Sequence, residues 1–454
     1  MKRNLLLLAY LSLMMLFASC EKYLDKKSDS RLVTPQTLRD LQGILDDHEQ
    51  MNIWTTPSLG EGSADDYFLL PASYTSYSIP YKNLYRWLPV EIRFGNDWDI
   101  AYHAIYNANL CLDLIGGIER NSSNAAAWDN VKGSALFYRA FYLLCLSTDY
   151  AKVYNESTAA SDLGVVLRLN SDFNVPSVRS SVKESYTQVI SDAMQSIDLL
   201  PTYPQHALRP SKGAAYGLLA RAYLYMGRYE QAGDWATAAL KLNSYLMDYN
   251  GDPSISGLSS AVPFKKFNSE TIFYTEMSVG NLVHTTTRSR IDTALVASYQ
   301  PGDLRRTAFF NNIGGYQQFK GSYASSNSIY FSGLATDELY LIRSESNAHL
   351  GALDEALKDV NLLLAKRWDK SKAFIPLSGT SKAEVLAKVR LERRKELLMR
   401  GMRWIDIKRY NREGENIIPT RNVDGEVYRL LPDARYYALP LPYGVIEQTG
   451  MPQN

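Results

Sequence analysis

The chain has 454 residues, 46% of them hydrophobic, with 49 Lys and Arg against 48 Asp and Glu. This length allows one large domain or two ordinary ones, and a near-neutral chain without a basic block argues against nucleic acid as the main partner. No segment after residue 20 reaches 18 consecutive apolar residues, so we expect no transmembrane helix. Tyrosine is frequent, with 32 residues against 14 phenylalanines, and favours surfaces that are apolar on one side and wet on the other.

The N-terminal segment predicts a secreted, lipid-anchored protein. Two basic residues precede an apolar run over residues 5–17, which is too short to cross a bilayer core of ~30 Å. The run ends in FASC, which resembles the lipobox of bacterial lipoproteins, where cleavage precedes the cysteine that carries the lipid. We expect a signal peptide at residues 1–19, a tether at 20–32 and lipidation, including palmitate, at Cys20. The alternative is a plain secreted protein whose cysteine happens to follow the cleavage site.

Hydrophobic periodicity predicts a mainly α-helical chain. Apolar residues recur at steps of three and four over the ranges 33–50, 96–115, 126–150 and 181–200. Cys111 and Cys145 lie in apolar helical stretches. We expect them to be buried and free, with one disulfide between them as the alternative.

Residues 51–95 differ from the helical segments around them. They hold nine aromatic residues and four prolines without a helical period, and predict a long excursion whose apolar content disfavours disorder. The segment GEGSADDYF offers Glu61, Asp65 and Asp66. Two carboxylates beside a cleft are what a glycosidase needs, but acid pairs on loops are more often solvated or capping. Calcium binding is a further alternative, although the spacing is not that of an EF-hand loop.

Two segments indicate helical hairpins. AAYGLLARAYLYMGRYEQAGDWATAAL at 214–240 resembles a tetratricopeptide (TPR) unit, and DELYLIRSESNAHLGALDEALKDVNLLLA at 337–365 repeats its scheme. The equivalent Ala232 and Ala356 lie 124 residues apart, so the units do not form one uninterrupted array. A loop-rich second excursion at 245–332 separates them.

The expected architecture is mainly α, with TPR-like hairpins as the scaffold and loop-rich excursions that carry little strand. We predict one domain over residues 33–454, with excursions at about 51–95 and 245–332. Binding sites usually lie on loops held by a rigid scaffold. We therefore predict that both excursions lie on one face and form one site.

The C-terminal third supports a family resemblance. RLERRKELLMRGMRWIDIKRYN resembles the signature of the SusD/RagB family, outer-membrane nutrient-binding lipoproteins of Bacteroidetes-type bacteria. Other segments agree in chain order: YLDKKS, WDIAYHAIYNANL, GSALFYRAFYLL, LGVVL, DLR, DELYLIRSESNAHLG and YYALPLPYGVIEQTGMPQN. The family usually has an acidic residue where this chain has Arg400. Acids interleave the bases of the signature, which predicts ion pairs along and between helix turns rather than a basic ligand patch. Surface pairs of this kind contribute ~0–1 kcal/mol each.

The resemblance implies a binding protein without catalytic activity. Such proteins capture nutrients, mostly glycans, and serve a SusC-like TonB-dependent transporter at the outer membrane. The residues agree, since five scattered histidines form no zinc motif and no nucleophile elbow is present. We expect no cofactor and no metal site. The alternative is a peptide-binding or TPR-like protein-interaction lipoprotein of the same family.

Glycan binding needs flat aromatic rings for sugar faces and polar groups for hydroxyls, because an unpaired buried hydroxyl partner costs ~1–3 kcal/mol. For each aromatic residue the alternative is packing within its loop. We predict ligand contacts from Trp54, Asp65, Asp66, Tyr67, Tyr74, Tyr77 and Tyr81 of the first excursion and from Tyr316 and Tyr323 of the second.

Overall fold

The computed structural model describes residues 35–92, 96–280 and 283–454. The predicted signal peptide, the tether and the lipidation site Cys20 lie outside these residues. In the described ranges, none of the helices combines the length and the apolar character that a membrane span requires.

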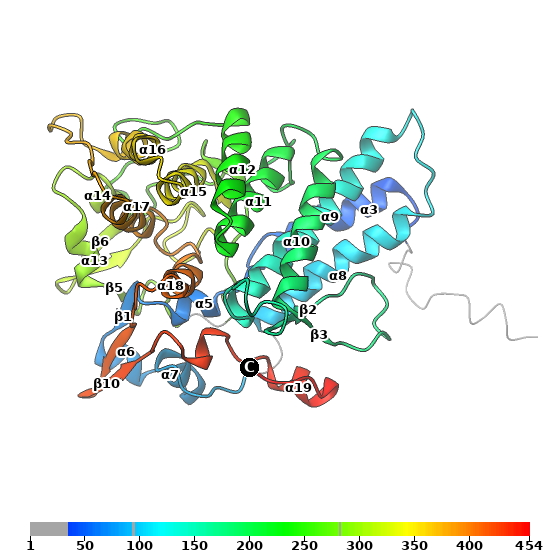
Figure 1. Cartoon of the computed structure of the whole chain (residues 1–454), viewed down its shortest axis with the longest axis horizontal. Helices are drawn as coiled ribbons and strands as arrows, with labels where there is room; N and C mark the ends of the chain where they lie inside the picture. Colours follow the sequence, from blue (N-terminus) through cyan, green and yellow to red (C-terminus); the bar gives the residue numbers. More distant parts are fainter. Residues whose placement is uncertain (1–34, 93–95, 281–282) are drawn as a thin grey trace, which may run out of the picture.

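Long helices form the scaffold, and each packs against the next in a continuous row (Figure 1). The row and the helices that complete it are α8 (Asp97–Ile115), α9 (Ala125–Tyr150), α10 (Val182–Ile197), α11 (Lys212–Met226), α12 (Tyr229–Leu242), α15 (Thr336–His349), α16 (Leu353–Arg367), α17 (Lys382–Glu396) and α18 (Arg403–Arg412). The mainly α-helical prediction is confirmed. Side-chain caps fix the starts of α8 and α10: Asn96 accepts from the first turn of α8, and Ser181 forms a capping box at α10.

The predicted helix at 33–50 was wrong in its length. The structure has two short helices there, α3 (Leu38–Leu45) and α4 (His48–Met51). A capping box formed by Thr37 and Asp40 starts α3, so the helix begins after Thr37 rather than at Pro35.

The two TPR-like hairpins are neighbours in space although 124 residues separate them in sequence. Gly227, with φ 77°, ends α11, and Gly351, with φ 84°, lies in the turn between α15 and α16. Helix α12 packs against α15. Small residues allow this approach, because a Cβ added at Gly233 would lie only 3.4 Å from the Ser346 Cβ.

Strand content is low, as predicted. In the described residues the strands form five two-stranded antiparallel sheets. Their strands are β1 (Tyr67–Leu69), β2 (Leu163–Val166), β3 (Arg179–Ser181), β4 (Thr271–Phe273), β5 (Ser289–Ile291), β6 (Phe310–Ile313), β7 (Tyr316–Phe319), β8 (Leu334–Ala335), β9 (Thr420–Val423) and β10 (Glu426–Arg429).

The first excursion contains short helices that hydrophobic periodicity missed: α5 (Leu59–Ser63), α6 (Pro71–Thr75) and α7 (Ile79–Tyr85). Further short helices later in the chain are α13 (Thr293–Ser298), α14 (Arg305–Phe309), η1 (Arg435–Tyr437) and α19 (Tyr443–Thr449). Pro71 and Pro80 lie in the first turns of α6 and α7. Proline is compatible with a first turn because its missing N–H would have no helical partner there.

The two excursions lie together. Strand β1 of the first pairs with β5 of the second, with Phe68 opposite Arg290, and Figure 1 shows the two strands side by side near α6. The Tyr77 hydroxyl donates to the Val283 carbonyl at 2.9 Å, and the Thr55 amide donates to the Glu276 carbonyl at 3.0 Å. The prediction that the excursions share one face is consistent with these contacts.

The charged C-terminal segment is structural, as predicted, but its ion pairs are buried and join different elements. Arg393 of α17 binds Asp406 of α18 at 2.9 Å, and Arg409 of α18 binds Glu345 of α15 at 2.7 Å. Cys111 is buried, Cys145 is half-buried, and both are free thiols.

Candidate functional site

An aromatic pair lies where the excursions meet. Phe68 of β1 and Tyr316 of β7 make an edge-to-face contact with ring centroids 5.3 Å apart. Tyr316 is 39% exposed, and Phe68 is half-buried. Directly paired residues of an antiparallel sheet share a face, so Arg290 lies beside Phe68 on β5. The sequence pointed to Tyr316 but missed Phe68 and Arg290, since their pairing joins strands more than 200 residues apart.

A second aromatic pair lies beside the turn that precedes β5, with Tyr77 buried and Tyr81 half-buried. The rings of Tyr77 and Tyr81 lie 5.8 Å apart, and the exposed Arg288 guanidinium lies 4.4 Å from the Tyr77 ring centroid. The Tyr81 hydroxyl donates to the Gly280 carbonyl at 3.2 Å. The aromatic face, as we name it, consists of Phe68, Tyr81, Arg288, Arg290 and Tyr316, and the buried Tyr77 ring lies beneath Arg288.

Four predicted tyrosines are packed inside the excursions. Tyr67, Tyr74, Tyr77 and Tyr323 are all buried. The Tyr67 hydroxyl donates to the Gly62 carbonyl at 2.6 Å, and the Tyr323 hydroxyl donates to Glu270 at 2.7 Å. Because their rings are covered and these hydroxyls are already bonded, they support the loops rather than offer a surface to a ligand.

Trp54 lies apart from the aromatic pair. It is 46% exposed and has a φ of 57°, a conformation that is rare for a bulky side chain. In the part of the chain that the structure describes, no ring contact or hydrogen bond joins Trp54 to Tyr316. Trp54 therefore stays a predicted ligand contact at a separate position of the first excursion.

The predicted acids Asp65 and Asp66 hold arginines. Arg403 binds both oxygens of Asp65 at 2.6 and 2.9 Å, and Arg394 binds Asp66 at 2.7 Å. Burial raises the pKa of Asp65, but Arg403 and Arg394 outweigh it and hold the pKa well below its usual range. These carboxylates fasten the first excursion to α17 and α18. They are therefore not the open pair that a glycosidase needs, nor free groups for sugar hydroxyls.

Buried acids also anchor α5. Asp97 accepts from the amides of Ser58 and Leu59, and Asp149 accepts from the Gly60 amide at 3.0 Å. Burial, and then the nearby Asp97, raise the pKa of Asp149 to about 7. The start of the first excursion thus depends on a carboxyl that is easily protonated.

Asp149→Asn should change the pH dependence of stability. An acid with a raised pKa binds its proton more tightly in the folded state, so its stabilising contribution is present at low pH and is lost as pH rises toward 7. The free energy of unfolding of the variant, relative to the unchanged protein, should rise between pH 4 and 6 by up to about 1.4 kcal/mol per pH unit. Urea unfolding across this range measures it.

Asp129→Asn is the control, since hydrogen bonding to the exposed Arg120 lowers the pKa of Asp129. Its relative stability should fall slightly with pH in the same window. A relative stability of Asp149→Asn that stays flat with pH would show that Asp149 titrates normally.

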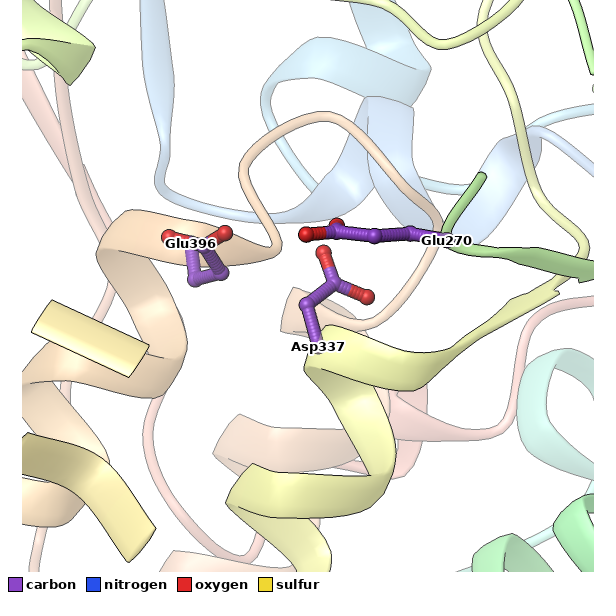
Figure 2. Close-up of side chains that lie close together, drawn as sticks. All are labelled: Glu270, Asp337 and Glu396. Atoms are coloured by element: carbon purple, nitrogen blue, oxygen red, sulfur yellow. The ribbon is translucent and has the colours of Figure 1, made fainter. Parts of the chain in front are cut away.

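Three carboxylates converge in the core, as Figure 2 shows. Glu270, Asp337 and Glu396 have oxygens within 4.8 Å of one another. Arg367 binds Glu270 and Glu396 at 2.8 Å each, and Arg400 binds Asp337. The guanidinium groups already supply the positive charge that a cation would bring, so the cluster is an ion-pair network of the fold.

A cavity of about 380 Å³ lies away from the aromatic face. Helix α8, the loop between β2 and β3, and α19 line it, with Trp98, Tyr106 and Phe173 among its residues. Its volume is within the usual range for ligand pockets. Several of its polar groups are bonded internally: Arg168 donates to Asp172, Val175 and Ser177. It is the second candidate for a ligand site.

Two family profiles together match residues 22–433 of the chain. A family profile described as "Starch-binding associating with outer membrane" matches residues 22–224, and one described as "SusD family" matches residues 221–433. No curated protein sequence matched the chain.

Solved structures share the fold. A putative sugar binding protein from Bacteroides vulgatus is 20% identical with a TM-score of 0.74, over 93% of this chain and 99% of that one. A SusD superfamily protein from Bacteroides thetaiotaomicron is 21% identical with a TM-score of 0.71, over 92% and 99%. A SusD-like carbohydrate binding protein from Bacteroides vulgatus is 20% identical with a TM-score of 0.67, over 92% and 97%. With the two adjoining profiles and the helical scaffold, these findings show that the chain belongs to the SusD/RagB family of outer-membrane-associated binding proteins.

Proposed function

We propose that this protein binds a glycan nutrient at the cell surface and passes it to a SusC-like TonB-dependent transporter. Lipidation at Cys20 would hold it on the outer membrane, facing outward. The mechanism is capture and transfer, with no bond made or broken. The observation that carries the proposal is the aromatic face, where Phe68 and Tyr316 come from different excursions and meet at an exposed surface.

The chemistry of this surface suits a saccharide. Aromatic rings pack against the apolar faces of sugar rings, while guanidinium groups donate hydrogen bonds to ring substituents. The acids that a glycosidase would need are held by arginines, which supports binding without catalysis. The alternative within the family is a peptide-binding or TPR-like interaction role. No feature of the described residues favours that role over glycan binding.

Affinity electrophoresis tests the proposal directly. The full chain, in a non-ionic detergent, would migrate through native gels that contain starch, xylan, mannan, alginate or polygalacturonate. We expect at least one polysaccharide to retard it. Phe68→Ala combined with Tyr316→Ala should weaken that binding about tenfold or more, which corresponds to ~1.4 kcal/mol.

Two single variants separate the candidate sites. Tyr106→Ala removes an exposed ring of the α8 cavity and should leave the retardation unchanged. Weaker retardation of Trp54→Ala would show that this separate exposed ring also contacts the polysaccharide. Binding that survives the Phe68 and Tyr316 double variant but is lost in Tyr106→Ala would place the site in the cavity. Retardation by no polysaccharide, together with binding of peptides, would favour the alternative function.

A further inference from the structure

The segments that build the aromatic face lack acidic residues. Residues 67–90, 277–291 and 304–336 contain seven Lys or Arg and not one Asp or Glu, whereas the chain has 48 acidic residues among 454. These segments include β1, β5, β6 and β7. Arg305 is buried in ion pairs with Asp303, Glu392 and Glu396, and the other six basic residues have no acidic residue within these segments.

Arg290 is buried at this face without a carboxylate partner. It is 8% exposed, and its Nη1 donates to the carbonyls of Thr287 and Ser289 at 3.3 and 2.8 Å. Its Nε is buried and has no hydrogen-bond partner. Among the described residues no Asp or Glu forms an ion pair with Arg290. A buried donor without a partner costs free energy, and a buried charge more so, unless something pairs with it.

Buried arginines in the helical scaffold have carboxylate partners. Arg139, Arg221 and Arg409 each bind both oxygens of a carboxylate, at distances of 2.6–2.8 Å. Arg290 therefore differs from these three scaffold arginines and has backbone carbonyls in place of a carboxylate, as does Arg421 of β9.

Arg288 adds a second open guanidinium. It lies two residues before Arg290 in the turn that leads into β5, where the Arg288 amide donates to the Thr285 carbonyl at 3.0 Å. Arg288 is exposed over the Tyr77 ring, and none of the ion pairs in the described ranges includes it. A guanidinium stacked on a ring keeps its in-plane donors free.

Neighbouring acids are engaged elsewhere. Asp292, just after β5, caps α13 by accepting from the Leu295 amide at 2.8 Å, and Asp66 is bound by Arg394. Glu426 accepts from the Tyr428 hydroxyl in the β9–β10 hairpin. These contacts leave the charges of Arg288 and Arg290 uncompensated within the face.

We propose that the ligand of the aromatic face is an anionic glycan, one that carries carboxylate or sulfate groups. Arg288 and Arg290 bind its acid groups, while Phe68 and Tyr316 pack against its sugar rings. This inference rests on the proposed function and narrows its substrate class. Planar carboxylates and sulfates both match the forked donors of arginine, and the bonds are charge-assisted.

The test compares charged and uncharged forms of one polymer. The full chain would be run in native gels that contain polygalacturonate or its methyl ester, alginate or its propylene glycol ester, and chondroitin sulfate or its desulfated form. Starch, xylan and mannan are the neutral set. We expect retardation by at least one acidic polymer, weakened at least tenfold when its acid groups are esterified or removed, and weakened further at high salt because charge pairs are screened.

Variants separate this site from non-specific charge attraction. Arg288→Gln with Arg290→Gln should weaken binding of the acidic polymer at least tenfold. Arg288→Gln alone changes only an exposed side chain, should weaken it severalfold, and keeps the test valid if the double variant misfolds. Arg39→Gln with Arg435→Gln removes the same charge from exposed positions elsewhere and should have no effect. Phe68→Ala with Tyr316→Ala leaves the charge unchanged and should also weaken binding about tenfold or more.

Each result decides. Retardation by neutral polymers alone, unaffected by the Arg288 and Arg290 variants, would overturn the proposal of an anionic ligand but would still support glycan binding. Equal losses in the Arg39 and Arg435 control would show general charge attraction and overturn the site. Retardation by none of the polymers would overturn the proposed function itself.

Discussion

Replacing Arg367 with alanine should lower the free energy of unfolding by about 3–5 kcal/mol, the usual cost of removing one partner of a buried ion pair. Arg367 is completely buried and joins Glu270 to Glu396, while its Nη1 donates to the Met247 carbonyl at 2.6 Å. Its loss leaves the buried Glu270 without a cationic partner and leaves Glu396 with Arg305 alone. Urea unfolding monitored by circular dichroism measures the change.

The pH dependence of this destabilisation would show that it arises from the unpaired carboxylate of Glu270. Burial raises the pKa of Glu270 to about 7 even with Arg367 present. Without the guanidinium the folded state should favour the protonated acid still more, so the destabilisation should be larger at pH 8 than at pH 5. The free energy of unfolding of Arg367→Lys should lie between those of the unchanged protein and of Arg367→Ala, because one ammonium group cannot reproduce the planar, forked donors of arginine.

Lys358→Ala is the control for this prediction. Lys358 pairs with Glu355 at 3.1 Å, but both side chains are exposed, and exposed pairs contribute little. Its unfolding curve should match that of the unchanged protein. A loss below about 1 kcal/mol for Arg367→Ala would show that the cluster of Figure 2 is not the ion-pair network that we describe.

Replacing Arg421 with alanine should have the second large effect, about 2–4 kcal/mol, together with weaker glycan binding. Arg421 of β9 reaches into the first excursion, where it donates to the carbonyls of Tyr85 and Ala64 at 2.7 Å each and Gly62 at 3.2 Å. Its guanidinium lies 3.8 Å from the Tyr85 ring centroid and 4.7 Å from that of Trp87. One side chain thus holds three backbone carbonyls of the excursion.

Because carbonyls and rings hold Arg421, rather than carboxylates, its contribution should change little with salt. Arg421→Lys should recover only a small part of the stability, since it lacks the forked donors. Arg429→Ala on the neighbouring strand removes an exposed arginine and should change neither stability nor binding. Arg421→Ala that unfolds normally but fails to bind glycan would indicate that it orders the excursion without contributing to global stability.

Local signals in the sequence were sufficient for the long helices of the scaffold. The apolar stripe and the Asn96 cap of α8, and the glycine turns of the TPR-like hairpins, depend only on residues a few positions apart. The family signature likewise follows from segments in chain order. These features determined the fold class and the family, and they placed the predicted ligand residues in two excursions.

Only the tertiary structure decided which of those residues form a surface. Pairing of β1 with β5 brings Phe68 beside Arg290, and no local pattern encodes a contact across that sequence distance. Burial separated Tyr67 and Tyr323 from the exposed Tyr316, although all three look alike in aromatic loops. Asp65 and Asp66 pair with Arg403 and Arg394, which lie more than 300 residues away in the sequence, so this pairing too depends on the tertiary structure. Hydrophobic period and caps act locally, whereas burial and charge pairing depend on which distant segments the folded chain brings together.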